Sequence, residues 1–431
     1  MDYDISVIGA GPAGLMGAKR AAEHGLKVIV IEKRKDIAKV TRACCQNFIM
    51  DEGYERESLK IVGDKVVFPV NGFEVTYQGP LIPMIDKYYI SPKGHAIHFA
   101  YPDRRPIAFK FNKDILLEGL YRECVKLGVE FRLHTLASHA REIDGGVLVE
   151  TVSRGRKLQI TSQKCLIADG INSRIAHALE FNEGRPCITR AFALIYELEK
   201  VKDFNPSAWK AFFGTSYGSK VPVLMGSSHH GEDVMELLLG GDATRMPEEI
   251  YHFFTTKSPL AYMFEKSKIV GRKGCSLKAR ASLRNPCRGN TVVIGDAAAY
   301  VEVQTQGALM CGYRAGDAVY REMNGEQGFT QYTKWWQESF EFNSEKAQQV
   351  AQGYALVPTY TDGELDYLFS LADNKILEGT WSQYKTPKLM WECFLEHKDR
   401  IAQEKPELYK KIASLDEMSL EDTYNVELSQ P

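Results

Sequence analysis

The feature that most constrains this chain of 431 residues is a glycine-rich turn near its start, Gly9-Ala10-Gly11-Pro12-Ala13-Gly14. A β-rich stretch, residues 4–8, precedes the turn, and a helical stretch that ends at Gly25 follows it. In such a unit the first glycine forms the turn, the second lets the backbone approach a pyrophosphate, and the third lets helix and strand pack closely. The start of the helix faces the pyrophosphate with unpaired N–H groups. We therefore predict a dinucleotide-binding domain at the N-terminus.

The second strand-like stretch, residues 27–31, ends at an acidic residue that supports this interpretation. Glu32 follows Gly14 by 18 positions, where a carboxylate can accept hydrogen bonds from ribose hydroxyls. We expect Glu32, Lys33 and Arg34 to lie against the nucleotide. The glycine motif alone does not distinguish FAD from NAD, because it binds the part that both cofactors share.

Two later segments separate these cofactors. A strand-like run at 291–294 leads into Gly295-Asp296 before a helix, and a central apolar run leads into Asp169-Gly170, with Ser173 and Arg174 after it. With the N-terminal glycines, these motifs resemble the flavoprotein superfamily that contains aromatic hydroxylases and geranylgeranyl reductases, over roughly residues 1–345. The resemblance implies FAD, although Asp169 also fits a simple turn. It implies flavin contacts from Arg42, Asp169, Gly295, Asp296, Gly307, Ala308 and Leu309.

The loop after Asp296 bears on what the flavin does. Hydroxylases of this superfamily usually read G-D-A-A-H there, followed by a proline, but Ala299 stands in the place of the histidine and no proline follows. The segment 305–309, Thr-Gln-Gly-Ala-Leu, aligns instead with a T-G-G-G-I-like segment of prenyl reductases. The resemblance favours a reductase of carbon–carbon double bonds in an apolar, isoprenoid-like substrate. Two alternatives stay open: an FAD-dependent monooxygenase, and a dehydrogenase that passes electrons to a quinone or a protein partner.

The adjacent thiols Cys44 and Cys45 are the candidate catalytic residues. Prenyl reductases carry a cysteine near the flavin ring at a comparable place, and Arg42 is close enough in sequence to favour a thiolate. A thiol there could supply the proton that completes alkene reduction, or shape the pocket; an ordinary cysteine pair is the alternative. The nine cysteines contain no C-x-x-C, so we expect no disulfide framework, zinc site or iron–sulfur cluster.

Other motifs are less specific. The aromatics Trp209, Phe212, Phe213 and Tyr217 fit an apolar substrate pocket or, more simply, the packing of a sheet. His229-His230 lacks metal-ligand spacing and acidic companions in the sequence, so we interpret it as a loop and expect no metal site.

Composition limits the partners. A net charge of −2 gives no reason to expect nucleic acid, and no apolar stretch is long enough to span a bilayer. We expect a cytoplasmic protein, in contact with the inner face of a membrane at most. Because no second G-x-G-x-x-G follows a strand, electrons must come from an external donor: NAD(P)H, ferredoxin or another protein.

The pattern of elements predicts an α/β fold: a Rossmann-like FAD-binding domain of the glutathione-reductase type, an inserted antiparallel-sheet substrate domain and a helical C-terminal extension. We assign residues 1–65, 98–185 and 275–345 to the FAD-binding domain. Residues 66–97 and 186–274 form the substrate domain, and 346–431 form the extension, in which we see no strand pattern.

Overall fold

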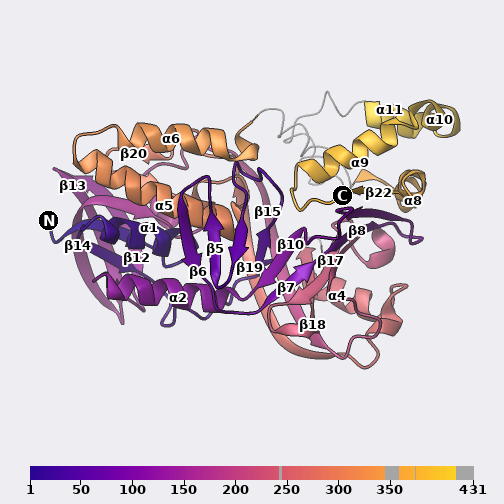
Figure 1. Ribbon diagram of the computed structural model, residues 1–431, viewed down its shortest axis with the longest axis horizontal. Coiled ribbons are helices and arrows are strands. Elements are labelled where there is room, and N and C mark those ends of the chain that lie inside the picture. The colour runs from indigo at the N-terminus through magenta and orange to yellow at the C-terminus, as the bar shows by residue number, and fades with distance from the viewer. Residues whose placement is uncertain (242–244, 345–358, 374, 414–431) are drawn as a thin grey trace.

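Two eight-stranded sheets lie side by side along the long axis of the molecule (Figure 1). The computed structural model describes residues 1–241, 245–344, 359–373 and 375–413. The mixed α/β fold confirms the predicted class. Among the described residues, no helix combines the length and the apolar character that a membrane crossing requires.

The first sheet carries the glycine-rich turn. Its parallel strands are continuous apolar runs, because helices cover both faces of such a sheet. An antiparallel meander of β12 (Leu136–Ile143), β13 (Gly146–Ser153) and β14 (Arg156–Ile167) extends it at one side. The strands are, in order, β11 (Glu130–Arg132), β2 (Val28–Ile31), β1 (Tyr3–Ile8), β14 (Arg156–Ile167), β13 (Gly146–Ser153) and β12 (Leu136–Ile143), with β21 (Thr291–Val293) on β14 and β20 (Cys287–Arg288) on β21.

Helices pack closely on this sheet because small residues line their contacts. A side chain at Gly312 would overlap with the carbonyl oxygen of Ala13, so the axes of the helices Pro12–Glu23 and Gln304–Met323 approach closely there. Gln304 and Pro12 begin these two helices near the same sheet edge. The helices are α1 (Pro12–Glu23), α2 (Lys113–Lys126), α3 (Arg174–Ala178), α5 (Gln304–Met323) and α6 (Gly328–Ser339).

The second sheet is mostly antiparallel. One predicted helix, α4 (Pro247–Thr256), packs against it, and Phe212 and Tyr217 are buried in that contact. The strand order is β19 (Lys268–Arg280), β15 (Cys187–Glu199), β18 (Gly231–Gly241), β17 (Val223–Ser228), β16 (Ala208–Phe212), β8 (Asp86–Ile90), β9 (Ala96–Ala100) and β22 (Ile376–Glu378).

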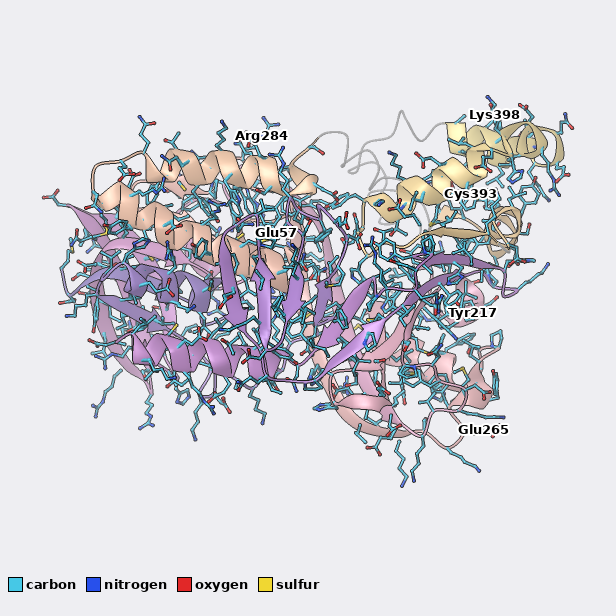
Figure 2. All side chains as sticks on the ribbon, viewed as in Figure 1. Glu57, Tyr217, Glu265, Arg284, Cys393 and Lys398 are labelled. Carbon is cyan, nitrogen blue, oxygen red and sulfur yellow. The ribbon has the colours of Figure 1, made fainter. Side chains whose placement is uncertain are left out.

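The C-terminal region completes this second sheet. The expectation of a strand-free extension is wrong here: β22 pairs in parallel with β9, although its three residues are too short to give a periodic signal. Helices α8 (Asp362–Leu371), α9 (Lys385–Leu395), α10 (Lys398–Glu404) and α11 (Pro406–Ala413) share an apolar core with β8 and β9. Figure 2 places Cys393 of α9 and Tyr217 on opposite sides of the sheet.

A buried lysine of the sheet forms hydrogen bonds with this C-terminal region. Lys87 on β8 donates from Nζ to Thr386 Oγ1 at 2.7 Å and to the carbonyl oxygen of Thr380 at 3.3 Å. The rings of Trp209 and Trp381 each lie with their centroid 5.8 Å from the same ammonium.

Two three-stranded sheets lie between these larger parts. The strands β5 and β6, at the start of the range 66–97, share the core of the first sheet through Phe68 and Phe73, whereas β8 and β9 belong to the second sheet. The division of the chain into domains stays a prediction. The small sheets are β3 (Asn47–Ile49), β10 (Ala108–Phe111) and β7 (Leu81–Met84), and β4 (Lys60–Val62), β5 (Lys65–Phe68) and β6 (Phe73–Thr76).

Candidate functional site

A cavity of about 390 Å³ opens where the parallel strands of the first sheet end and where α1 and α5 begin. Open α/β sheets bind their ligands at this edge. The structure brings together residues from separate parts of the chain there. Of the residues predicted to bind the cofactor, those that line this groove are Gly9, Gly11, Pro12, Ala13, Glu32, Lys33, Arg34, Arg42, Asp169, Gly295, Asp296 and Ala308.

The three glycines of the turn have separate roles. Gly9 has a φ of +101°, and a Cβ there would lie 2.5 Å from the carbonyl oxygen of Ala168. A Cβ at Gly14 would overlap with the carbonyl oxygen of Gly9, so this glycine serves packing and does not line the groove. A Cβ at Gly11 would meet nothing within 4 Å, which leaves room for a ligand against the backbone. No side chain caps α1, so its first N–H groups face this space.

Glu32 lies at the end of β2, as predicted, and is 4% exposed. Its Oε2 accepts from the backbone N–H of Ala10 at 2.7 Å, and its Oε1 accepts from that of Arg34 at 2.8 Å. Burial disfavours the charged form, but the bonds from Arg34 and the backbone outweigh it and hold the pKa of Glu32 below its usual value. The carboxylate is therefore ionised and fixed beside the glycine turn.

Asp169 forms the turn contact that the sequence allowed, and one of its two carboxylate oxygens has no partner. One carboxylate oxygen, Oδ2, accepts from the N–H of Arg174 at 3.1 Å, at the start of α3. The other oxygen, Oδ1, is buried without a hydrogen-bond partner, and burial raises the pKa of this carboxyl group. A buried oxygen left unpaired on a groove wall indicates a ligand donor, because such a group is costly otherwise.

The far end of the groove is charged. Arg42 Nη1 lies 3.7 Å from Asp296 Oδ2, and the other oxygen of Asp296 accepts from the N–H of Val303 at 3.1 Å. Lys113 and Glu302 also line this end. Val301, just before α5, has a φ of +59°, which is strained for a β-branched residue and is typical of functional loops.

Only part of the predicted segment 305–309, in the first turn of α5, lines the groove. Ala308 lines it, and so does Thr305. Gly307 faces inward, where a Cβ would lie 2.9 Å from Cε1 of Phe340, and Leu309 is fully buried in the core. The structure therefore does not bring Gly307 and Leu309 to the groove, because a helix turns successive side chains away from one another.

The two adjacent cysteines face different spaces. Cys44 lines the groove, with its Sγ 3.5 Å from Lys113 Nζ. Cys45 lines a separate small cavity together with Trp209, Met84 and Leu224. Burial raises the pKa of the Cys45 thiol well above its usual value, which disfavours a thiolate at this one of the two candidate cysteines.

The comparisons with known proteins agree with this geometry. Residues 2–64 match the family model described as an FAD binding domain. A digeranylgeranylglycerophospholipid reductase of Methanosarcina mazei is 23% identical over 427 residues, which cover 92% of this chain and 97% of that protein. The enzyme of the same name from Methanosarcina acetivorans is 23% identical over 360 residues, covering 78% and 81%.

A solved structure shares the fold over nearly the whole chain. The geranylgeranyl bacteriochlorophyll reductase-like protein of Thermoplasma acidophilum superposes with a TM-score of 0.70 at 17% identity, and the match covers 96% of this chain and 99% of that one. This chain is an FAD-dependent oxidoreductase that is similar to geranylgeranyl reductase-like proteins. A p-nitrophenol 4-monooxygenase of Pseudomonas putida also shares the fold, with a TM-score of 0.54 at 13% identity over 96% of this chain and 98% of that one.

The groove of this oxidoreductase fits FAD. The open backbone at Gly11 and the uncapped start of α1 suit the pyrophosphate, and the unpaired Oδ1 of Asp169 can accept from a hydroxyl. Glu32 lies beside the glycine turn, and Arg42 and Asp296 line the same groove. The individual contacts of these residues with FAD stay predictions.

Sequence reasoning missed several residues that line the groove. Lys113 begins α2 behind the cap Asn112, and its place in the groove depends on long-range packing. Arg174 belongs to a motif that the sequence displayed, but only the fold shows that it lines the groove. The others that were not singled out as site residues include Thr135, Asn172, Glu302 and Thr305.

The histidine pair differs partly from expectation. His229-His230 does form the turn between β17 and β18, as predicted for a loop. Acidic companions are present, however: Glu197 and Glu236 come from two other parts of the sheet and lie within 3.4 Å of the histidine nitrogens. Sequence spacing could not reveal them, because sheet pairing brings distant residues together.

Proposed function

We propose that this oxidoreductase reduces carbon–carbon double bonds in the isoprenoid chains of an apolar lipid. The observation that carries the proposal is the position of the two cysteines, which line the flavin groove and a small cavity with apolar and charged walls on either side of one peptide bond. A double bond held beside Trp209, Met84 and Leu224 would thus lie next to the flavin end of the groove. The names of the archaeal relatives support the same substrate class.

The chemistry divides between cofactor and protein. When bound, FAD supplies a hydride from N5 to one alkene carbon, and the other carbon takes up a proton, so that the π bond is replaced by two C–H bonds. The chain's own residues orient the lipid, exclude water and hold the proton. Cys45 is the candidate for holding it, because burial keeps its thiol protonated at neutral pH. Cys44 faces the flavin groove and is the candidate for shaping that pocket.

The electron donor and the site of action belong to the proposal as well. We expect an external donor, NAD(P)H, ferredoxin or another protein, because the chain offers one dinucleotide motif, and FAD occupies it. We expect the enzyme to meet its lipid at the inner face of a membrane. Sedimentation with anionic lipid vesicles tests that contact.

The test is a single-turnover reduction. The FAD-loaded protein is reduced with dithionite without air and mixed with a digeranylgeranyl glycerophospholipid, and products are followed by mass spectrometry as gains of two hydrogens. Cys45→Ser should lower the rate by about 10²-fold if the thiol holds the proton, whereas Cys393→Ser, far from the groove, should not change it. A Cys45→Ser enzyme with unchanged turnover would remove the thiol from the mechanism.

The monooxygenase alternative has a direct test. The reduced enzyme is mixed with oxygen and its absorbance followed in time. Slow reoxidation with no intermediate agrees with a reductase. A fast, substrate-stimulated phase with a hydroxylated product would replace the proposed function.

A further inference from the structure

Beside the cavity that Cys45 lines, charged side chains are buried inside the second sheet. Glu197 on β15 and Glu236 on β18 are register partners, and both are buried. Like charges directly opposite each other destabilise a sheet, and burial increases that penalty. Such an arrangement does not serve folding, and buried charges gathered beside a cavity indicate a functional role.

Lysines balance the two carboxylates. Lys110 of β10 forms a buried ion pair with Glu236, and Lys273 Nζ of β19 lies 3.2 Å from Glu197 Oε1. Gly271, opposite Glu197, provides the space for this carboxylate, because a Cβ there would overlap with Oε2 of Glu197. Lys110 and Glu236 both line the cavity of Cys45, and Lys110 Nζ donates to the carbonyl oxygen of Cys45 at 2.7 Å.

His229 joins the two ion pairs. Its Nε2 lies 3.0 Å from Lys273 Nζ and its Nδ1 lies 3.3 Å from Glu236 Oε1. An ammonium can only donate, so Nε2 accepts, and in the neutral ring the proton is then on Nδ1. Nδ1 faces Glu236 Oε1 and also the side-chain nitrogen of Gln46 at 3.2 Å, which cannot donate to it in this state. An imidazole held in this way can take a proton at one nitrogen and release another from the opposite nitrogen.

The outer end of the network reaches solvent. His230 Nε2 lies 3.4 Å from Glu197 Oε2, and the His230 side chain is 49% exposed. A continuous series of polar contacts therefore leads from solvent to the cavity wall through His230, Glu197, Lys273, His229, Glu236 and Lys110.

We propose that this series is a proton path that supplies the proton consumed in each double-bond reduction. The proposal rests on the proposed function. One proton leaves the Lys110 ammonium for the alkene carbon, directly or through the Cys45 thiol, and Glu236 passes a replacement from His229 to Lys110. One proton enters from solvent at His230. The groups between return to their starting states, so the path gains and loses no electrons.

A metal site is the competing interpretation. One ligand atom from each of Glu197, His229 and His230 lies within 4.8 Å of the others. A divalent cation would, however, add two positive charges beside Lys273, whose ammonium already neutralises Glu197. The charge balance therefore favours proton transfer.

The first experiment tests the entry point by chemical rescue. His230→Ala should lower the rate of lipid reduction about tenfold, and added imidazole should restore it, since a small base can replace the missing entry group. Glu236→Gln should lower the rate about 10²-fold without rescue. His252→Ala, an exposed histidine on α4, is the matched control and should behave as wild type. A His230→Ala enzyme that is as fast as wild type, or slow but not rescued, would overturn the path.

The second experiment is independent of turnover. ¹⁵N NMR of the histidine rings should show His229 protonated at Nδ1, and Glu236→Gln should change its chemical shift. A proton at Nε2 would contradict the path, and so would stoichiometric Zn²⁺ binding that His230→Ala abolishes. If wild type reduces no isoprenoid lipid, the proposed function fails, while the NMR result still decides whether the hydrogen-bonded path exists.

Discussion

Replacing Lys87 by Met should flatten the dependence of stability on pH. Burial lowers the pKa of this lysine from 10.5 to about 7. Between these two pKa values the unfolded chain binds the proton and the folded chain does not, so wild-type stability rises with pH. The free-energy cost of burying the charged form of Lys87 is fully present below pH 7 and falls to zero as the pH approaches 10.5.

The magnitude follows from that pKa difference. At about 1.4 kcal/mol for each pH unit, burying the charged lysine costs about 5 kcal/mol, of which about 2 kcal/mol is relieved between pH 7 and pH 9. Lys87→Met retains the apolar stem and lacks the charge. Its free energy of unfolding should therefore lack this increase, and at pH 7 the variant should be at least as stable as wild type.

Urea unfolding followed by tryptophan fluorescence is the assay, since Trp209 and Trp381 surround the ammonium. Lys93→Met, at an exposed lysine, is the control and should retain the wild-type pH dependence. If wild type and Lys87→Met gain stability equally between pH 7 and pH 9, the reasoning is refuted. Cation–π contacts with the aromatic rings would then offset the hydration energy that the ammonium loses on burial.

Three further predictions concern the groove. Gly14→Ala should lower thermal stability and weaken FAD binding more than tenfold, because its Cβ would overlap with Gly9, whereas Gly11→Ala should fold normally and weaken only FAD binding; melting curves and flavin fluorescence titrations measure both. Asp169→Asn should weaken FAD binding about tenfold if Oδ1 accepts from the cofactor, and unchanged affinity in the same titration would exclude that contact. Val301→Gly should raise the free energy of unfolding by about 1 kcal/mol by releasing backbone strain, and a loss in urea unfolding would show that φ is unstrained there.

The sequence predicted what local chemistry specifies. The glycine turn, the carboxylate at Glu32 and the Gly295-Asp296 corner each follow from a strand that ends in a turn, and the structure places all of them on one groove. Gly307 and Leu309 were predicted from an aligned segment, but their direction depends on where α5 begins. The helix begins at Gln304, after a strained loop whose conformation cannot be predicted from its residue types.

The charged network of the second sheet could not be predicted from the sequence. His229-His230 looked like an isolated turn because its partners, Glu197 and Lys273, come from strands far away in the sequence. Their meeting depends on the register of the second sheet, which is a property of the assembled fold. Strand β22 was missed for a related reason, since a three-residue strand exists only through its partner.

The pairing of β22 with β9 also limits how early the second sheet can be completed during synthesis of the chain. Glu378 is paired with Ala100, and 278 residues separate them along the chain. At a synthesis rate of about 5–20 residues per second, the edge of β9 waits on the order of 15–60 s for its neighbour. A nascent chain of this protein therefore carries an unpaired sheet edge of the kind that recruits foreign strands, and chaperone protection over that interval would matter more than the final stability.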